Sequence, residues 1–494
     1  MNQDLHPSIF SCKEWKQGNG VIFSSYNPAT GHMLWQGKSA DVNQINEAVM
    51  SARQAFPTWS NLTIDERTIF LNNFQQILKL ESSNLTEIIA KETGKTLWDS
   101  ASEVKAMIDK IELSLGAYGS RCAGMINIIQ PATRNIVRHR PHGVIVVIAP
   151  FNFPGHLANG HIIPALLAGN TIVLKPSELT PLVAEKMIEC WEKAKLPKGV
   201  INLVQGGSEV GKALVENPQI NGVFFTGSYK TGKWLIETLG RQSTKILAVE
   251  MGGNNPLIIG NTEHIKLAAY QAIQSAYLSS GQRCTCARRL IIIKNNKTEE
   301  FIQFFQELIE SIVVGAYDSN PEPYMGPVIR ELHAINFLKS QEMLAHSGGK
   351  ILNEMKHLAK GTGLLSPGLM DVTHVKDRPD EEIFGPFLQI IRVNNLEEAL
   401  QEANSTKFGL SAGIITDHQS DYDFFYKNIR AGVVNWNTQL TGASSSAPFG
   451  GIGWSGNFRP SAYYAADYCS YPVASMETSD FKNPLNMPPG LKPY

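Results

Sequence analysis

One cysteine of the chain stands in a segment whose residue types suit covalent chemistry. Cys284 lies in the run Ser-Ser-Gly-Gln-Arg-Cys-Thr-Cys at residues 279–286, after a predicted helix and a Gly-Gln turn. A free cysteine is most often a small buried hydrophobe. A metal site is disfavoured, because a closed site takes four ligands and no histidine lies within 15 residues of Cys284. The other interpretation is a nucleophile, which at a reference pKa of ~8.5 needs help to ionise.

Two other polar side chains follow predicted strands and could assist such a nucleophile. Glu250 ends an apolar strand and precedes two glycines that leave room for a ligand, so it is a candidate general base. Asn152 follows a buried strand in a Pro-rich turn, where its amide could donate to a developing oxyanion. Each also has a plain interpretation, Glu250 as a surface glutamate and Asn152 as a turn residue that bonds its own backbone.

Further strand ends carry residues that suit a dinucleotide. Lys175 and Glu178 could hold the two hydroxyl groups of a ribose, and the carboxylate of Glu178 would repel a 2′-phosphate, which favours NAD over NADP. A glycine turn at 226–232 leads from a strand into a helix whose free amides could receive a pyrophosphate. The candidates in this turn are Gly227, Ser228, Tyr229, Lys230, Thr231 and Gly232. The turn lacks the usual G-x-G-x-x-G pattern, so a βα turn capped by Ser228 is the alternative.

The elements that must position these residues are buried strands alternating with helices. Continuous apolar runs predict strands at 143–150, 170–178, 200–206 and 222–227, with a helix at 181–195 between two of them. A second series after residue 250 has strands at 256–259 and 287–294 and helices at 265–279 and 299–313. This alternation predicts an α/β fold with doubly wound parallel sheets, which bind ligands beyond the carboxyl ends of their strands.

The first third of the chain has helical periodicity. Ile45, Val49, Ala52 and Phe56 share one helical face, and Thr63 with Glu66 forms a capping box. The run Thr-Gly-Lys-Thr at 93–96 lacks the earlier glycine of a P-loop and predicts a helix end. Residues 124–140 suggest a hairpin that leaves the domain body, and residues 469–477 alternate like an edge strand, which invites pairing with another subunit.

Composition excludes several classes of protein. The 494 residues include 44 Lys and Arg against 45 Asp and Glu, and 43% are hydrophobic, so the chain should fold and has no electrostatic reason to bind nucleic acid or an acidic membrane. Six cysteines in so long a chain are no disulfide framework. The N-terminus lacks the apolar core of a signal peptide, and no stretch approaches the ~20 residues of a membrane span. We therefore expect a cytoplasmic protein.

Taken together, these segments resemble the aldehyde dehydrogenase superfamily over essentially the whole chain. The matching runs are PFNFP at 150–154, KPSE at 175–178, FTGSYKTG at 225–232, VEMGGNNP at 249–256, GQRCTCARR at 281–289, EEIFGP at 381–386 and APFGGIGWSG at 447–456. The resemblance implies that Cys284 is the nucleophile, Glu250 the base and Asn152 an oxyanion donor. It also implies an NAD site that uses the cofactor candidates above, with Glu382 and Phe384 at the nicotinamide ribose and ring.

The resemblance also implies an arrangement of domains. An NAD-binding domain would comprise residues 1–123 and 141–249 with a return of 436–465, and a catalytic domain would comprise residues 250–435. Residues 124–140 and 466–494 would form an oligomerisation element and tail, so the expected partners are further copies of this chain in a dimer or tetramer. Neither nucleic acid, membrane nor bound metal is expected.

Longer runs resemble most closely the members that oxidise N-succinylglutamate 5-semialdehyde in arginine breakdown. This substrate bears two carboxylates, and Arg283 and Arg459 are hypotheses for their partners, because guanidinium groups suit bidentate carboxylate binding. Alternation along an extended chain could instead direct Arg283 away from Cys284. Three rivals stay open: a dehydrogenase for succinate or glutamate semialdehyde, a non-catalytic binding relative, and a thiol redox sensor that pairs Cys284 with Cys286.

Overall fold

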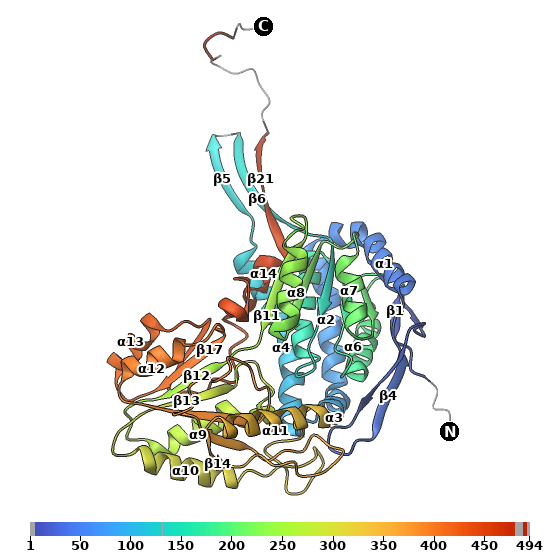
Figure 1. Ribbon diagram of the computed structural model, residues 1–494. Helices are drawn as coiled ribbons and strands as arrows, with labels where there is room; N and C mark the ends of the chain where they lie inside the picture. The colour runs from blue at the N-terminus through green and yellow to red at the C-terminus, as the bar shows by residue number, and fades with distance from the viewer. Residues whose placement is uncertain (1–4, 131, 480–487, 492–494) are drawn as a thin grey trace.

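Two seven-stranded sheets form the body of the protein (Figure 1). The structure is a computed structural model, and it describes residues 5–130, 132–479 and 488–491. Within these ranges, no helix is both long enough and apolar enough to cross a lipid bilayer.

The first sheet has the strand order β11-β10-β7-β8-β9-β1-β2. The strands from β11 to β9 are parallel, whereas β1 pairs antiparallel with β9 and β2. Every residue of β7, β8 and β9 is buried, as expected for strands covered on both faces. The strands are β1 Ile9–Ser11, β2 Glu14–Lys16, β7 Val144–Ile148, β8 Thr171–Lys175, β9 Ile201–Val204, β10 Gly222–Gly227 and β11 Ile246–Met251.

Helices cover both faces of this sheet and enclose two apolar cores. The helices on one face are α1 Val42–Asn61, α7 Ser208–Glu216 and α8 Tyr229–Leu239. The helices on the other face are α2 Ile64–Leu80, α3 Ser82–Thr93, α4 Leu97–Arg121, α5 His156–Ala168, α6 Pro181–Lys193 and the short α14 Ala465–Tyr468. The first sheet is therefore doubly wound.

The second sheet repeats this arrangement with the order β14-β15-β16-β13-β12-β17-β18, in which only β14 is antiparallel. Its strands are β12 Asn255–Ile259, β13 Ala287–Ile293, β14 Lys350–Asn353, β15 Gly368–Asp371, β16 Phe387–Val393, β17 Ser411–Ile415 and β18 Val433–Trp436. One face packs against α9 Ile265–Tyr277 and α10 Thr298–Glu310. The other face packs against α11 Glu331–His346, α12 Leu396–Asn404 and α13 Gln419–Asn428.

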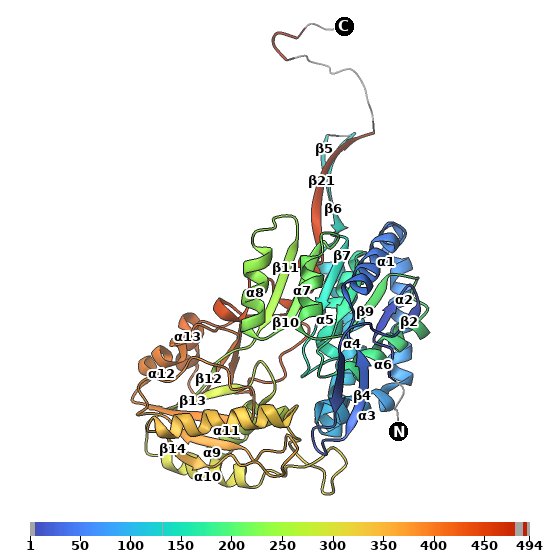
Figure 2. The same ribbon diagram turned by 45° about the vertical axis from the view of Figure 1, so that its right-hand side comes forward.

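A three-stranded arm stands away from this body in both views (Figures 1 and 2). Its order is β21-β6-β5, and all pairs are antiparallel. The strands are β5 Met125–Gln130, β6 Thr133–Pro141 and β21 Ser470–Thr478. The remaining short elements are β3 Ile22–Tyr26, β4 Met33–Lys38, β19 Pro448–Phe449, β20 Ser461–Ala462 and the 3-10 turns η1 Leu278–Gly281 and η2 Gly453–Ser455.

The structure confirms the α/β class, the parallel sheets and the hairpin at 124–140. It also confirms the capping box, in which Thr63 accepts from the backbone of Glu66 and the Glu66 carboxylate accepts from the backbone of Thr63. The helical interpretation of the first third is wrong for residues 9–38, which form β1 to β4. These strands are short and partly polar, and so lack the alternation that identifies a strand.

The predicted division into domains stays a prediction. The structure gives two sheets and an arm, but a boundary between domains is a further interpretation. Residues 1–4, 131, 480–487 and 492–494 of that division lie outside the described residues.

Candidate active site

The backbone around Cys284 is bent by a tight turn that precedes β13. Ser279 and Ser280 adopt left-handed conformations with φ of 52° and 57°. Gly281 follows with φ of 71°, and a Cβ on it would lie 2.0 Å from the carbonyl oxygen of Gly385. Only glycine fits there, so the Gly-Gln pair of the sequence has a steric reason. The turn holds Cys284 half-buried at the edge of the second sheet.

Asn255 at the start of β12 anchors this loop. Its side-chain nitrogen donates to the carbonyl oxygens of Cys284 at 2.7 Å and of Cys286 at 2.9 Å. Its side-chain oxygen accepts from the backbone nitrogen of Ser411 at 3.0 Å. The sequence interpretation quoted Asn255 within the run at 249–256 without giving it a role. An amide residue two positions after paired glycines, at the start of an apolar strand, is the signal that could have identified it.

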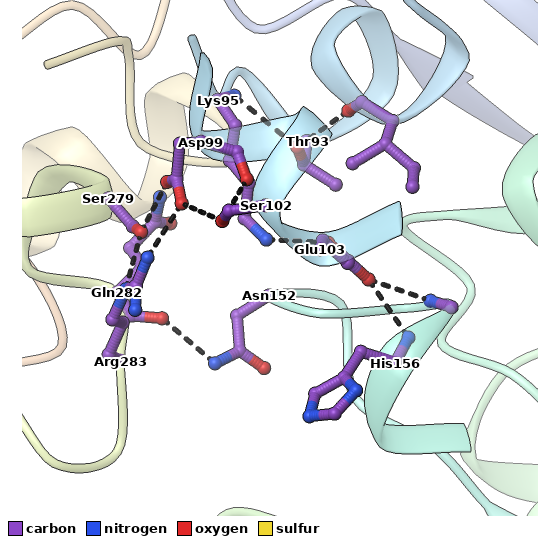
Figure 3. Close-up of polar contacts among 12 residues, drawn as sticks. Thr93, Lys95, Asp99, Ser102, Glu103, Asn152, His156, Ser279, Gln282 and Arg283 are labelled. Atoms are coloured by element: carbon purple, nitrogen blue, oxygen red, sulfur yellow. Dashed lines mark hydrogen bonds and ion pairs between the residues drawn. The ribbon is translucent and has the colours of Figure 1, made fainter. Parts of the chain in front are cut away.

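Asn152 reaches the cysteine loop from the other sheet. It follows β7, is only 6% exposed, and donates through its side-chain nitrogen to the carbonyl oxygen of Gln282 at 2.9 Å (Figure 3). An amide nitrogen carries two hydrogens, so this bond leaves one of them free to donate. Asn152 and Cys284 also line the same cavity. The structure therefore brings together two side chains that lie 132 residues apart along the chain.

Glu250 in β11 is buried, with one oxygen bonded and the other free. Its Oε1 accepts from the backbone nitrogen of Ser461 at 3.2 Å, and Ser461 lines the cavity that holds Cys284. Its Oε2 is buried without a hydrogen-bond partner among the described residues. Burial raises the pKa of Glu250 well above its ordinary value. A buried carboxyl with an unused oxygen is suited to exchange a proton with a ligand or water.

The thiol of Cys284 is held in its neutral form. Burial, reinforced by the carboxylates of Glu382 and Glu250, raises its pKa to about 12. The pKa of the thiol therefore depends on the ionisation of both acids. A thiol in this state attacks a carbonyl only if a neighbouring base takes its proton.

The cavity next to Cys284 has a volume of about 210 Å³. Its wall combines one side of α4, the start of α5, the cysteine loop and residues 442–445. The lining includes Arg283 but not Arg459, which is exposed and lies near His142. No described contact therefore supports the predicted substrate role of Arg459, whose place on the exposed side of its loop the sequence did not reveal.

Arg283 lines the cavity, but its charge is already compensated. Its guanidinium pairs with Asp99 of α4 at 2.6 Å and donates to Ser279 at 2.8 Å (Figure 3). It also lies over the ring of Phe153. Asp99 is nearly fully buried, with a side chain that is 2% exposed. Arg283, which was predicted to bind a carboxylate of the substrate, is thus already paired with a carboxylate of the protein.

A buried ion pair supports the same wall. Lys95 and Glu103 are 2.6 Å apart with side chains 3% and 0% exposed. The other oxygen of Glu103 accepts from the backbone nitrogens of Gly155 and His156, both at 3.0 Å (Figure 3). Gly155 has no side chain to cap α5, so Glu103 satisfies the free amides at that helix start. The contact fixes α5 against α4, and both helices line the cavity.

The cofactor candidates lie at the carboxyl ends of the first sheet. Lys175 ends β8, is 5% exposed, and lies 3.6 Å from the carboxylate of Glu178, which is about half exposed. Ser228 caps α8 by accepting from the backbone of Thr231, as the alternative interpretation of that turn expected. Gly232 packs against Met251, where a Cβ would lie 2.2 Å from the sulfur.

Not every residue of the predicted 227–232 segment faces open space. The ring of Tyr229 stacks on Trp454 with centroids 4.1 Å apart and meets Phe408 edge-on. Lys230 and Thr231 are exposed, and Gly227 is half-buried. The segment therefore offers a capped helix start for a phosphate, while Tyr229 holds the helix against the loop that contains η2.

Glu382 and Phe384 border the site from the second sheet. The carboxylate of Glu382 lies against Gly252, where a Cβ would be 1.7 Å from Oε2, and its Oε1 is buried without a hydrogen-bond partner among the described residues. Burial raises the pKa of Glu382 to about 7, against the opposing charge of Arg288 at 3.6 Å. Phe384 meets Phe151 edge-on at 5.9 Å. Oε1 faces Arg288 at 3.6 Å without a hydrogen bond, so the carboxylate of Glu382 keeps the capacity to accept a hydrogen bond from a ribose hydroxyl.

Lys110 is a cavity residue that the sequence interpretation missed. It lies on α4, lines the cavity and is 2% exposed. The signal was present, because Lys110 falls between Met107 and Ile111 on the buried face of a helix, where a lysine needs an explanation. In the part of the chain that the structure describes, no cluster of three or more metal-binding side chains occurs.

A protein with this geometry matches a known family in sequence and several solved structures in fold. The family model described as "Aldehyde dehydrogenase family" matches residues 15–472. A putative aldehyde dehydrogenase from Burkholderia cenocepacia is similar in structure, with a TM-score of 0.91, 27% identity, and 99% of this chain and 100% of that chain covered.

Two further solved structures are similar over nearly their whole length. An NADP-dependent glyceraldehyde-3-phosphate dehydrogenase from Bacillus halodurans C-125, complexed with NADP, has a TM-score of 0.90, 28% identity, and coverage of 96% of this chain and 100% of that one. A 1-pyrroline-5-carboxylate dehydrogenase from Thermus thermophilus has a TM-score of 0.90, 28% identity, and coverage of 96% and 93%. The chain belongs to the aldehyde dehydrogenase family.

Proposed function

We propose that the protein oxidises N-succinylglutamate 5-semialdehyde to N-succinylglutamate with NAD, a step in the breakdown of arginine to glutamate and succinate. One observation carries the chemical part of this proposal. Cys284 and Asn152 line a single cavity, and the backbone amide of Ser461 on its wall binds Glu250. A nucleophile, an oxyanion donor and a base are thereby available to one aldehyde carbon.

The reaction begins with Cys284. A neighbouring carboxylate, with Glu250 as the candidate, accepts the thiol proton, and the sulfur adds to the aldehyde carbon. The carbonyl oxygen becomes an oxyanion, which accepts hydrogen bonds from the free amide hydrogen of Asn152 and from the backbone nitrogen of Cys284. Donors of this kind stabilise the transition state, and loss of one costs about 3 kcal/mol.

NAD held by the cofactor residues described below would accept the hydride that leaves the tetrahedral carbon when its oxyanion reforms the carbonyl, and the carbon would remain as a thioester on Cys284. Once Glu250 has passed the thiol proton to solvent, its carboxylate takes a proton from a water molecule, whose oxygen attacks the thioester. The C–S bond breaks, the free acid leaves, and Glu250 returns the proton to the thiolate of Cys284. The free Oε2 of Glu250 is suited to this role because it is buried without a partner. Division into acylation and hydrolysis makes each step easier than the direct oxidation.

The cofactor proposal rests on fit at the strand ends. Lys175 and Glu178 would hold the adenosine ribose, and the start of α8 would receive the pyrophosphate. The carboxylate of Glu382, which has no hydrogen bond to Oε1 within the described residues, would accept from the nicotinamide ribose. Phe384 would contact the nicotinamide ring. The half-exposed carboxylate of Glu178 would repel a 2′-phosphate, which supports NAD over NADP.

The substrate proposal rests on the resemblance of the longer sequence runs. It is tested by kcat/KM of the purified enzyme on three aldehydes: N-succinylglutamate 5-semialdehyde, glutamate semialdehyde and succinate semialdehyde. We expect the succinylated substrate to exceed the others by at least about tenfold, because its extra groups offer further contacts. A preference for either shorter aldehyde would overturn the substrate. The absence of measurable turnover of these three aldehydes and of neutral aldehydes would overturn the enzymatic role.

We also propose that the protein is a homo-oligomer that assembles through the arm. Strand β21 lies at one edge of the arm, and β5 at the other edge exposes Met125, Ile126, Ile128 and Ile129. An open strand edge with apolar side chains is a surface that pairs readily. Light scattering of the full chain should give the mass of a dimer or tetramer, and a monomer at micromolar concentration would contradict the proposal.

A further inference from the structure

The cavity next to Cys284 contains a cation without a counter-ion. Lys110 is 2% exposed, and its Nζ donates to the carbonyl oxygen of Ala462 at 2.9 Å. An ammonium group has three hydrogens to donate, and this is the one hydrogen bond that the described residues give it. No carboxylate within the described ranges forms an ion pair with Lys110. A buried charge in this state is costly unless something else compensates it.

The titratable groups around Lys110 do not supply a negative charge. His156 and His161 of α5 are neutral, because burial lowers their pKa to about 4 and about 3, with the charge of Lys110 contributing. The thiol of Cys469 is neutral, since burial raises its pKa well above the ordinary value. Glu103 lines the cavity, but Lys95 and two backbone amides already use its oxygens.

The other cation of the cavity wall differs in this respect. Arg283 has its own carboxylate, Asp99, at 2.6 Å. Lys110 is thus the one positive charge of the described lining that is not balanced by an acid of the protein. Burial lowers its pKa to about 8, which still leaves the ammonium form predominant at neutral pH.

We infer that Lys110 is the specificity residue of the cavity and binds a carboxylate of the aldehyde substrate remote from the reacting carbon. The carboxylate would bind the ammonium hydrogens that Ala462 leaves free, and Ser444 and Ser445 on the facing loop offer hydroxyl donors to the same anion. This assigns to Lys110 the task that the sequence alone suggested for Arg283 and Arg459. The inference deepens the proposed function and rests on it for the position of the aldehyde.

The test compares an anionic with a neutral aldehyde on a variant that removes only the charge. Lys110→Met keeps a straight apolar stem in a buried place, so the fold should survive. We expect KM for N-succinylglutamate 5-semialdehyde to rise about 10- to 100-fold, the range of one charge-assisted hydrogen bond, while KM for hexanal changes less than about twofold. Lys110→Arg should restore part of the loss. Lys105→Met on the exposed side of α4 is the matched control and should match wild type.

Two outcomes would overturn the inference. An unchanged KM for the anionic aldehyde would show that no carboxylate meets Lys110, and an equal loss on both aldehydes would show a purely structural role. If Lys110→Met fails to fold, Lys110→Gln, which keeps a donor without the charge, is measured by the same criterion.

These results separate the inference from the proposed function. A wild-type enzyme that prefers another carboxylated aldehyde, but loses its preference for anions in Lys110→Met, would contradict the proposed substrate and support the role of Lys110. If the wild-type enzyme preferred the succinylated aldehyde and Lys110→Met kept that preference, the result would support the proposed substrate and contradict the role of Lys110.

Discussion

The side-chain amide of Asn255 donates a 2.7 Å hydrogen bond to the carbonyl oxygen of Cys284. Together with its bond to Cys286, this contact fixes the loop from which the thiol and its backbone amide project. Asn255 is 2% exposed and touches the loop from the neighbouring strand, so it is a positioning residue. It acts through the backbone of the nucleophile.

Replacement of Asn255 by aspartate should separate its two functions. The aspartate keeps the acceptor for Ser411 but loses both donors to the loop. We expect kcat to fall about 10- to 100-fold with KM little changed, since a small displacement of the thiol misaligns attack. Unfolding in urea should show a loss of about 1–3 kcal/mol from unsatisfied carbonyl groups. Asn404→Asp, which alters a surface amide, should leave kcat at the wild-type value.

Removal of the nucleophile should abolish oxidation. Cys284→Ala leaves no group to form the thioester, so NADH production should fall by about 10⁴-fold or more in a spectrophotometric assay. Cys286→Ala should keep most of the activity, because the sulfur of Cys286 is buried against the carbonyl oxygen of Leu278. If both variants were equally inactive, or if mass spectrometry found a bond between the two sulfurs in active enzyme, the roles given to them would be wrong.

The pH profile should report the buried base. The pKa of Glu250 is raised, so the carboxyl becomes protonated, and unable to accept a proton from water, at a higher pH than an ordinary glutamate. The rate of hydrolysis should therefore fall as pH decreases through that raised pKa. Glu250→Gln should reduce kcat about 10²- to 10⁴-fold and remove this acidic limb. If the decrease in rate at low pH persisted in Glu250→Gln, the titrating group would be a residue other than Glu250.

Cofactor choice should depend on the carboxylate of Glu178. Glu178→Gln removes a charge that would repel the 2′-phosphate, so kcat/KM with NADP should rise about five- to tenfold relative to NAD. Glu209→Gln on α7 removes another exposed carboxylate and should leave the ratio unchanged. A ratio that does not move in Glu178→Gln would place the adenosine ribose elsewhere.

Removal of one partner from the buried ion pair in the cavity wall should be strongly destabilising. Glu103→Leu leaves Lys95 buried without its partner and the start of α5 without its acceptor, so the free energy of unfolding should fall by about 3–5 kcal/mol. Asp109→Ala breaks the exposed pair with Lys105 on the same helix and should cost less than about 1 kcal/mol. Equal costs would mean that water reaches Glu103.

The sequence predicted those parts of the fold that have a strong local signal. Strands buried on both faces, such as β7 and β8, leave continuous β-branched runs, and Ser228 caps a helix with the residue type that physics favours. Strands β1 to β4 were not predicted because they are too short or too polar to show a clear alternation, and β1 also depends on its pairing with the distant strand β9. Pairing at long range leaves no local pattern.

For the site, the sequence indicated which residue types could react, but it did not indicate which side chains contact them. Cys284, Glu250 and Asn152 could be chosen because each follows or precedes a glycine- or proline-rich turn at a strand end. Whether an arginine is free to bind substrate depends on what it meets in three dimensions, and Arg283 meets Asp99. Lys110 was overlooked for the same reason, since its lack of a counter-ion is visible only once the helices are packed.

Asn152 belongs to the turn after β7, whereas its partner Gln282 precedes β13, so this 2.9 Å contact, like the pair of Asp99 with Arg283, joins the part of the molecule built on the first sheet to the part built on the second. Each of these two parts has its own apolar cores, so we expect each to stay folded when the contacts between them weaken. A displacement of about 1 Å at these contacts would lower the turnover rate about 100-fold. On heating, the enzyme should therefore lose its activity at a temperature several degrees below that at which circular dichroism detects unfolding of the helices.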